Sequence, residues 1–422
     1  MKILYLHQYF NTPSMWGSHR SYEMARRLVK YGHDVHIVTS YMNDHKSNEG
    51  KSKIDKPFNT IEDGINVHWI PVNYSNHMTF YKRIFAFIKF SIFSIPYMFK
   101  IKADMIYATS TPLTVSIPAI VCKFFTGIKF VFEVRDLWPE LPIAIGALKN
   151  PFLKFFARRL EALSYKYSDG IVALSPGMKD GIIKCGQNPK KIAVIPNLCD
   201  FKRFSKDVPS IRTKFKYIKD DEPLLVFAGV FGEINNVDWI IELAQELEKL
   251  SSKSKILLIG DGKTKSEIIV KVNNLNLENR VYIEDPIAKD LMPLVLKNST
   301  LSIITFSDLP AMRNNSANKF FDALASNTPV VINFGGWINT LVKENNCGVD
   351  CWQKSVKDAA IEINNKIQNK EWIEAAGRNA GQLGKKYFDR DLAAHNLNLI
   401  LKAVLNNEKN LSKYAPEDYN LD

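Results

Sequence analysis

The chain of 422 residues exceeds the ~250 to 300 residues at which one hydrophobic core usually stops growing, so we expect two domains. With 46% hydrophobic and 24% charged residues, its composition is that of a folded globular protein and excludes a disordered one. The formal net charge is +12, and residues 1–190 carry 25 Lys and Arg against 14 Asp and Glu, so nearly all of the excess lies in the N-terminal half. No zinc finger or RNA-binding motif accompanies this charge, so nucleic acid is not an expected partner.

The odd number of cysteines and their scatter favour reduced thiols. Only Cys347 and Cys351 lie close together in the sequence, and no second pair or nearby His completes a metal site. The N-terminus leads directly into a strand pattern without the features of a signal peptide. We therefore expect a cytoplasmic protein without a structural metal.

In chain order, the N-terminal half alternates strand and helix patterns. The apolar runs typical of buried strands are Lys2–Phe10, Asp34–Tyr41, Ile65–Val72, Ala103–Ser110, Lys129–Val134 and Gly170–Ser175. A helix after Arg20 is indicated by Met24, Leu28 and Tyr31 on one face, with Gly32 as its stop. This alternation predicts a parallel sheet covered by helices on both faces.

The segment from Tyr81 to Lys102 interleaves aromatic and basic residues. Lys89 and Pro96 interrupt its apolar run, which is too short to span a membrane. We expect an amphipathic segment that lies on an anionic membrane surface, and the alternative is a buried helix with lysines that reach solvent. The residues expected to contact the membrane are Lys82, Arg83, Phe85, Lys89, Phe93 and Lys100.

A second series of strands follows Ile195-Pro196-Asn197. Its apolar runs are Pro223–Val230, Lys255–Gly262, Val281–Ile287, Leu301–Asp308 and Pro329–Gly336. The two series predict an α/β protein of two doubly wound domains joined near residues 197–222. Ligands of such domains bind beyond the carboxyl ends of the strands.

The stretch RNNSANKFFDALASNTPVV, from Arg313 to Val331, connects two of these strands through a polar loop and a helix. The first turn of a helix offers free N–H groups and the positive end of its dipole, which suit an anion. Arg313 and Lys319 flank the loop, and Asp322 shares a helix face with Lys319. The pattern favours a site for phosphates and a ribose. The alternative is an ordinary loop with a capping Asn and a solvated charge pair.

Five segments in order carry a family resemblance: HQYFNTPSMWGSHRSYEMARRLVKYGHDVHIVTS, FEVRDLWPE, VIPNLCD, IGDG and NKFFDALASNTPVV. They resemble the retaining family 4 glycosyltransferases of GT-B fold, especially bacterial members that build O-antigen and capsule polysaccharides. The resemblance implies two Rossmann-like domains facing a cleft. Residues 1–197 would bind the acceptor, 198–390 the nucleotide-sugar donor, and 391–422 would form a helical tail that crosses back to the N-terminal domain.

The same resemblance implies transfer of an N-acetylated amino or deoxyamino sugar from a UDP-linked donor to a lipid-linked saccharide. The enzyme would work on the inner face of the plasma membrane and need no metal or other cofactor. Two alternatives remain: a nucleotide-sugar epimerase of the same architecture, and a noncatalytic protein that binds a nucleotide sugar. An epimerase needs paired carboxylates and a His around the donor sugar, and the sequence does not supply this set.

Donor contacts are implied at the family's motif positions. Gly17 matches the glycine of the first βα loop and is followed by Ser18, while Gly229, Asp261 and Asn318 fall in later motif loops. Asn314 and Asp322 occupy the positions of the family's two glutamates, so the first carboxylate is missing and the second is shortened. Val230 and Asn235 stand where many members place Arg and Lys, which shifts the task of binding phosphate to Arg313 and Lys319.

The loop after the fifth N-terminal strand holds the candidate catalytic residues. Arg135 matches the position of the family's functional His, and Asp136 is a candidate either to accept the acceptor's proton or to orient Arg135. Glu140 is a second candidate base, which we expect Pro139 to hold outside any helix.

Overall fold

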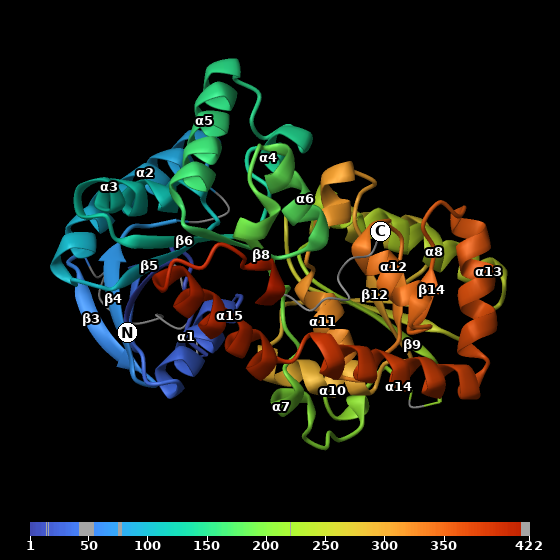
Figure 1. Ribbon diagram of the computed structural model, residues 1–422. Coiled ribbons are helices and arrows are strands. Elements are labelled where there is room, and N and C mark those ends of the chain that lie inside the picture. Colours follow the sequence, from blue (N-terminus) through green and yellow to red (C-terminus); the bar gives the residue numbers. More distant parts are fainter. Residues whose placement is uncertain (14, 16, 42–54, 75–77, 220, 415–422) are drawn as a thin grey trace. The chain divides into compact units, whose positions relative to one another are not determined.

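The structure, a computed structural model, describes residues 1–13, 15, 17–41, 55–74, 78–219 and 221–414. These residues form two compact units, the first made of Met1–Pro196 with Arg390–Asp422 and the second of Asn197–Asp389. Each unit contains one sheet with helices packed on it, which confirms the expected α/β fold of two doubly wound domains (Figure 1).

The first unit is built on an eight-stranded sheet of order β3-β4-β2-β1-β5-β6-β7-β8. The strands are β1 (Lys2–Leu6), β2 (Asp34–Tyr41), β3 (Phe58–Glu62), β4 (Ile65–Pro71), β5 (Met105–Thr109), β6 (Lys129–Val134), β7 (Gly170–Ala173) and β8 (Ile192–Val194). The helices are α1 (Arg20–Lys30), α2 (Phe80–Lys100), α3 (Ser116–Thr126), α4 (Glu140–Ala144), α5 (Pro151–Tyr167), α6 (Pro176–Lys184) and α15 (Arg390–Leu405).

One edge of this sheet differs from the expected all-parallel arrangement. Strand β3 pairs antiparallel with β4 through a tight turn at Asp63 and Gly64, both of which have positive φ. An Asp-Gly pair between two strands is a hairpin signal, because these residues accept the left-handed conformation that a two-residue turn requires. All other strand pairs that the structure records in the first unit are parallel.

Helices α2, α3 and α5 cover one face of this sheet, and α1 and α15 lie on the other (Figure 1). The core beneath α2, α3 and α5 contains Phe90 and Met98 of α2, Ala119 of α3 and Tyr165 of α5. On the opposite face, α15 is fixed to α1 by ion pairs from Arg390 to Glu23 and from Arg27 to Asp391. The C-terminal helix therefore completes the core of the N-terminal unit.

The second unit is built on a parallel sheet of order β11-β10-β9-β12-β13-β14. The strands are β9 (Leu224–Ala228), β10 (Lys255–Ile259), β11 (Val281–Glu284), β12 (Leu301–Ile304), β13 (Val330–Ile332) and β14 (Gly348–Asp350). The helices are α7 (Phe201–Phe204), α8 (Val237–Lys249), α9 (Lys265–Asn274), α10 (Met292–Lys297), α11 (Asn318–Ala325), α12 (Trp337–Glu344), α13 (Val356–Ile367) and α14 (Lys370–Tyr387).

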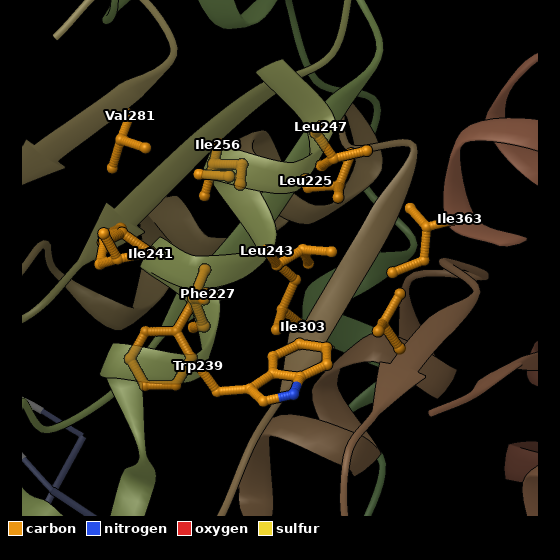
Figure 2. Close-up of a cluster of buried hydrophobic side chains, with 14 of the residues drawn as sticks. Leu225, Phe227, Trp239, Ile241, Leu243, Leu247, Ile256, Val281, Ile303 and Ile363 are labelled. Atoms are coloured by element: carbon orange, nitrogen blue, oxygen red, sulfur yellow. The ribbon is translucent and has the colours of Figure 1, made fainter. Parts of the chain in front are cut away.

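Apolar residues at helical spacing explain how the second unit packs. Helix α8 buries Ile240, Leu243, Ala244 and Leu247, which lie three or four residues apart on one face. These side chains meet Leu225 and Phe227 of β9 in a continuous core (Figure 2). This core holds β9 rigidly in the centre of the sheet, and the loop that follows β9 is therefore anchored at its base.

Two local expectations need correction. Glu140 does not lie outside a helix, because Pro139 is the residue that precedes α4 and Glu140 is the first residue of that helix. Proline is well tolerated at the start of a helix, where its missing N–H would have no partner. Several expected strands also run past their true ends, and β1 stops at Leu6 instead of Phe10, whereas β2 and β6 have the expected bounds.

Candidate active site

The order of strands locates a candidate ligand site in the second unit. The chain leaves the sheet in opposite directions from β9 and β12, which are neighbours, and the loops that follow these strands can separate to admit a ligand. The loop after β9 contains Gly229 and a 3-10 turn at Glu233–Asn235. The loop after β12 contains Phe306 and a 3-10 turn at Pro310–Asn314 and leads into α11.

Lys319 of α11 brings these two loops together. Its ammonium lies 4.2 Å from the ring centre of Phe227 and 5.0 Å from that of Phe306, and it donates a hydrogen bond of 2.9 Å to Asn235 Oδ1. Burial of the ammonium lowers the pKa of Lys319 to about 7. Among the residues that the structure describes, no acidic side chain is recorded in contact with this ammonium, so an anionic ligand would be favoured here.

Lys319 places its ammonium beside the loop after β9, where the sequence lacks the two basic residues of the family pattern. Asn235, which stands at one of the two family positions for a basic residue, accepts the Lys319 hydrogen bond. Val230, at the other position, is 61% exposed. A Cβ on Gly229 would lie 3.4 Å from Lys319 Nζ and 3.2 Å from the Phe227 ring, so glycine at this position keeps the space beside the ammonium open.

The start of α11 adds a second favourable element for an anion. The residue before the helix is Ala317, whose side chain cannot cap the free N–H groups of the first turn. Asn318 is the exposed first residue of the helix, and Asp322 is partly exposed one turn further on. The structure therefore places Asn318, Lys319 and Asp322 within two turns of one helix, as the sequence indicated.

The other candidate donor residues have separate environments. Arg313 forms an ion pair of 3.1 Å with Asp308, and its guanidinium lies 5.4 Å from the ring centre of Trp352. Asn314 is the partly buried last residue of its 3-10 turn. Asp261 is exposed after β10 and accepts a hydrogen bond of 2.8 Å from the Gly262 N–H. No contact between Arg313 and Lys319 is recorded among the described residues.

The first unit has an equivalent switch point between β1 and β5. His7 follows β1, Ser110 follows β5, and Arg135 follows β6. Arg135 donates from Nη1 to His7 Nε2 at 3.2 Å and from Nη2 to Ser18 Oγ at 3.3 Å, while its N–H donates to Ser110 Oγ at 3.0 Å. Two residues of the connection between β1 and α1, His7 and Ser18, and one of the loop after β5, Ser110, therefore converge on Arg135.

His7 is a neutral support for Arg135. Burial and then the charge of Arg135 hold the pKa of His7 well below its ordinary value of 6.5. A guanidinium can only donate, so His7 Nε2 accepts, its proton lies on Nδ1, and Nδ1 donates to Ser21 Oγ at 2.9 Å. This arrangement fixes both the tautomer of His7 and the orientation of Arg135.

A buried ion pair lies beside this group. Arg20 donates to Glu133 Oε1 from Nε at 3.1 Å and from Nη2 at 2.9 Å, and the two side chains are 3% and 0% exposed. Burial raises the pKa of Glu133, but the charges of Arg20 and Arg135 outweigh it, so the net pKa is lowered. Arg20 also donates to the backbone oxygens of Ile195 and Pro196, which ties the start of α1 to the chain beyond β8.

Asp136 and Glu140 have different surroundings. Asp136 accepts a hydrogen bond of 3.0 Å from Thr111 Oγ1, and burial raises its pKa against the opposing effects of Arg135 and Thr111. A raised pKa makes a carboxylate a better proton acceptor. Glu140 instead lies close to Glu161 of α5, since its charge, after burial, helps raise the pKa of Glu161 to about 7. The structure therefore groups Asp136, and not Glu140, with Arg135.

Gly17 and Ser18 precede α1 at this site. Gly17 has a φ of +115°, and a Cβ there would lie 2.7 Å from Asn11 Nδ2, so a larger residue would be strained. Ser18 Oγ accepts from Arg135 and also from the Arg20 N–H at 3.4 Å. Ser18 is thus in the same cluster as Arg135, and Gly17 is its neighbour in the chain.

Sequence reasoning missed His7, Arg20 and Glu133 as members of the N-terminal site, and Phe227 and Phe306 as the enclosure of Lys319. Glu133 and Arg135 alternate along FEVRD at the end of β6, and an acidic residue inside an apolar strand was the available signal. The partners of Lys319 gave no such signal, because Phe227, Asn235 and Phe306 are distant from it in the sequence.

Helix α2 has two apolar faces. Phe87, Phe90 and Met98 are buried in the core, whereas an opposite stripe is exposed, with Phe85 at 69% and Phe93 at 48%. Lys82 and Lys100 are exposed, and Lys89 lies over the Phe93 ring at 5.6 Å. Arg83 was expected to contact the membrane as well, but it is only partly exposed and its Nε is buried. Within the described ranges, no helix is both long and apolar enough to cross a membrane.

Known proteins are similar to the chain over almost its whole length. Residues 18–203 match the model of Glycosyltransferase Family 4, and residues 210–383 match that of Glycosyl transferases group 1. One relative, N-acetyl-alpha-D-glucosaminyl L-malate synthase of Bacillus anthracis, is 20% identical over 407 residues, which is 92% of this chain and 94% of the relative.

Two solved structures share the fold. Sucrose-phosphate synthase of Thermosynechococcus elongatus superimposes with a TM-score of 0.75 at 14% identity, over 96% of this chain and 99% of that protein. HepE of Anabaena, solved in complex with UDP-glucose, gives a TM-score of 0.68 at 16% identity, over 96% of this chain and 100% of that protein. With its N-terminal half matching one glycosyltransferase family and its C-terminal half another, the chain belongs to the GT-B glycosyltransferases and resembles their family 4.

Proposed function

We propose that this glycosyltransferase moves an N-acetylated amino or deoxyamino sugar from a UDP-linked donor to a lipid-linked saccharide, with retention of configuration. The binding of UDP-glucose by HepE supports the nucleotide. The similarity to N-acetyl-alpha-D-glucosaminyl L-malate synthase of Bacillus anthracis supports the class of sugar and an α-linked product. A surface polysaccharide is the proposed destination of the transferred sugar.

The environment of Lys319 is the observation that carries the donor assignment. Bond breakage between the sugar C1 and the diphosphate leaves negative charge on a phosphate oxygen, which must be stabilised. Lys319 offers an ammonium without a counter-charge, and the first turn of α11 offers free N–H groups beside it. Asp322, on the same helix, is proposed to accept hydrogen bonds from the ribose hydroxyls. These groups neutralise the diphosphate without a metal ion.

The acceptor would be activated in the first unit. In the proposed step the acceptor hydroxyl forms a new bond to C1 on the face from which the diphosphate departs. Its proton passes either to a departing phosphate oxygen or to Asp136, whose raised pKa favours proton uptake. Arg135, held by His7 and Ser18, is proposed to place its positive charge next to the reacting groups.

A lipid-linked acceptor requires access to a membrane. The exposed stripe of α2, with Lys82 and Lys100 beside Phe85 and Phe93, supports reversible docking on an anionic surface. We propose that the enzyme works as a peripheral protein on the inner face of the plasma membrane.

Product analysis tests this function. The full chain is incubated with UDP-N-acetylglucosamine or related donors and a lipid extract that contains saccharide acceptors, with and without EDTA. The expected results are a glycosylated lipid, an α-linkage by NMR and equal rates in both samples. Sugar isomerisation without transfer, or nucleotide binding without turnover over a broad donor panel, would contradict the proposal. A rate abolished by EDTA and restored by a divalent ion would contradict its metal-free part.

A further inference from the structure

The exposed phenylalanines of this protein are confined to one surface. Every Phe that is exposed among the described residues lies on α2, α3 or α5, the three helices that cover one face of the N-terminal sheet. Most exposed apolar residues of a soluble protein are scattered singly, whereas a contiguous group marks an interaction surface. The sequence analysis recognised the α2 portion of this surface and missed the rest.

Helix α5 contributes the largest missed portion. Phe152, Phe155 and Phe156, in its first two turns, are 73%, 54% and 63% exposed. The N-terminus of the helix is stabilised by Asn150, whose side chain accepts hydrogen bonds from the N–H groups of Phe152 and Leu153. Its far end is buried through Ser164 and Tyr165. The aromatic turns are thus presented on a rigid base, and α5 extends beyond the sheet of its own unit (Figure 1).

Buried contacts hold the three helices together beneath their exposed aromatic side chains. Ser164 Oγ of α5 donates to Ser116 Oγ of α3 at 2.6 Å, and Cys122 Sγ of α3 donates to the Met98 oxygen of α2 at 3.6 Å. At the end of α3, Phe124 and Phe125 are 73% and 72% exposed, and the Phe125 ring lies 6.4 Å from that of Phe99 on α2.

The charge of the surface identifies its partner. Helices α2, α3 and α5 together contain nine Lys and Arg residues and one acidic residue, Glu161, which is buried. On α5, Arg158 and Arg159 are exposed next to the phenylalanines, and Arg159 lies 5.3 Å from the Phe155 ring centre. Aromatic side chains ringed by cations, without exposed acids, match the interface of an anionic bilayer. A self-association surface would bring like charges together.

We propose that α5 is a second membrane-docking element, whose exposed phenylalanines insert into the interfacial region of an anionic bilayer beside the α2 stripe. This inference rests on the proposed membrane docking through α2 and is independent of the proposed sugar transfer. Electrostatic attraction by α2 brings the protein to the surface, and insertion by α5 holds it there. Binding should therefore keep a component that persists when salt screens the charges.

Vesicle binding tests the inference. Flotation is measured on vesicles of phosphatidylcholine with phosphatidylglycerol, for the wild type, for the triple variant Phe152→Ser, Phe155→Ser, Phe156→Ser, and for Phe85→Ser, Phe93→Ser on α2. The control is Ile361→Ser on α13, an exposed position of the second unit. We expect the α5 variant to partition at least about tenfold more weakly, because three aromatic groups no longer leave water, and the control to bind as the wild type does.

A fluorescent reporter locates the insertion. Cys185 is the exposed cysteine among the five free thiols, so Phe155→Cys in a Cys185→Ser background accepts an environment-sensitive label selectively. Its emission should rise and shift to the blue on anionic vesicles and be quenched by lipids that carry a quencher on the upper acyl chain. A label at Ile361→Cys should not respond.

Each outcome has one meaning. Wild-type binding by the α5 variant, or a label that stays in water, would overturn the inference, and loss by the α2 variant alone would leave the proposed docking intact. If the wild type is a dimer in the absence of vesicles and the α5 variant is a monomer, the surface serves self-association. This result would also overturn the inference. The thermal shift produced by a UDP-sugar should be unchanged in all variants, and it tests the donor assignment separately.

Discussion

Lys319 connects donor binding to pH. Its pKa of about 7 in the free protein means that binding of a diphosphate diester must be accompanied by proton uptake above that pH. Affinity for a UDP-sugar should fall as pH rises from 6 to 9, measured by calorimetry in buffers of different ionisation enthalpy. In Lys319→Arg the guanidinium stays charged, so the pH dependence should be lost.

Removal of the Lys319 cation should weaken donor binding. In Lys319→Ala we expect a loss of about 1.5–3 kcal/mol, the range for a hydrogen bond to a charged group. Lys263→Ala is the matched control, because Lys263 is 87% exposed near Glu233 and faces solvent. Equal losses in the two variants would show that the effect arises from net charge instead of a phosphate contact.

Asp322 provides a test of ribose recognition. The substitution Asp322→Asn keeps the size of the side chain but leaves one acceptor oxygen instead of two charged ones. It should lower the affinity for UDP by about tenfold, with an unchanged melting temperature in the absence of ligand. A 2′,3′-dideoxy nucleotide should bind the wild type and the variant equally, and any remaining difference between them would refute a ribose contact.

Glu133 is expected to matter for stability. Loss of one partner of a buried ion pair leaves the other uncompensated, so Glu133→Gln should destabilise the first unit by about 3–5 kcal/mol in urea denaturation. Because the pKa of Glu133 is lowered in the folded state, this contribution is present above its ordinary value of 4.5 and is lost as pH falls. Glu246→Gln, at a partly exposed pair with Lys249, should change stability by less than about 1 kcal/mol.

At the scale of elements, the two faces of α2 reconcile the two sequence hypotheses for this segment. The helix is a buried helix through Phe90 and Met98 and a surface helix through Phe85 and Phe93. Period alone could not decide between these hypotheses, because apolar and aromatic residues occur on every side of this helix. Burial decided it, since three-to-four spacing places Tyr81, Phe85, Ile88 and Ile92 on the side opposite the core.

The basic residues of α2 should govern the salt dependence of docking. Replacement of Lys82, Lys89 and Lys100 by Gln removes about 1 kcal/mol of attraction per residue at an anionic surface. At low salt the triple variant should co-sediment with anionic vesicles much less than the wild type does. At 1 M salt, where the Debye length is about 3 Å, the two proteins should differ little. Arg83→Gln should have a smaller effect, because Arg83 Nε is buried. Equal binding of the wild type to neutral and anionic vesicles would contradict electrostatic docking.

At the scale of the whole molecule, the chain returns to its first unit after completing the second. Helix α15 buries Leu397, Ile400 and Leu401, and Asn398 Oδ1 lies 2.7 Å from His33 Nε2. A chain ended at Asp389 would therefore expose an apolar face of the first unit while leaving the second unit complete.

This division predicts the behaviour of fragments. Residues 197–389 alone should fold cooperatively and be stabilised by UDP-sugars, since the proposed donor residues of α11 and the β9 loop lie within them. Residues 1–196 alone should be protease-sensitive until a peptide of residues 390–414 is added. Calorimetry and limited proteolysis measure both effects, and a stable, protease-resistant 1–196 fragment would contradict the structural role of α15.

The sequence by itself determined the fold class and the positions of most strands. Buried parallel strands are continuous apolar runs, helices have apolar residues every three to four positions, and both patterns can be read from neighbouring residues alone. It also pointed to Lys319 and Asp322, on a helix that follows one such strand, and to Arg135, in the loop after another, as candidate site residues. Tertiary structure decided what surrounds them. Phe227 and Phe306 enclose Lys319, a neutral His7 lies beside Arg135, and Glu140 lies near Glu161. These features depend on contacts between residues far apart in the chain, and burial likewise decided which phenylalanines of α2 and α5 stay exposed. Such contacts leave no periodic signal, since they arise only when the sheet brings the strand ends together.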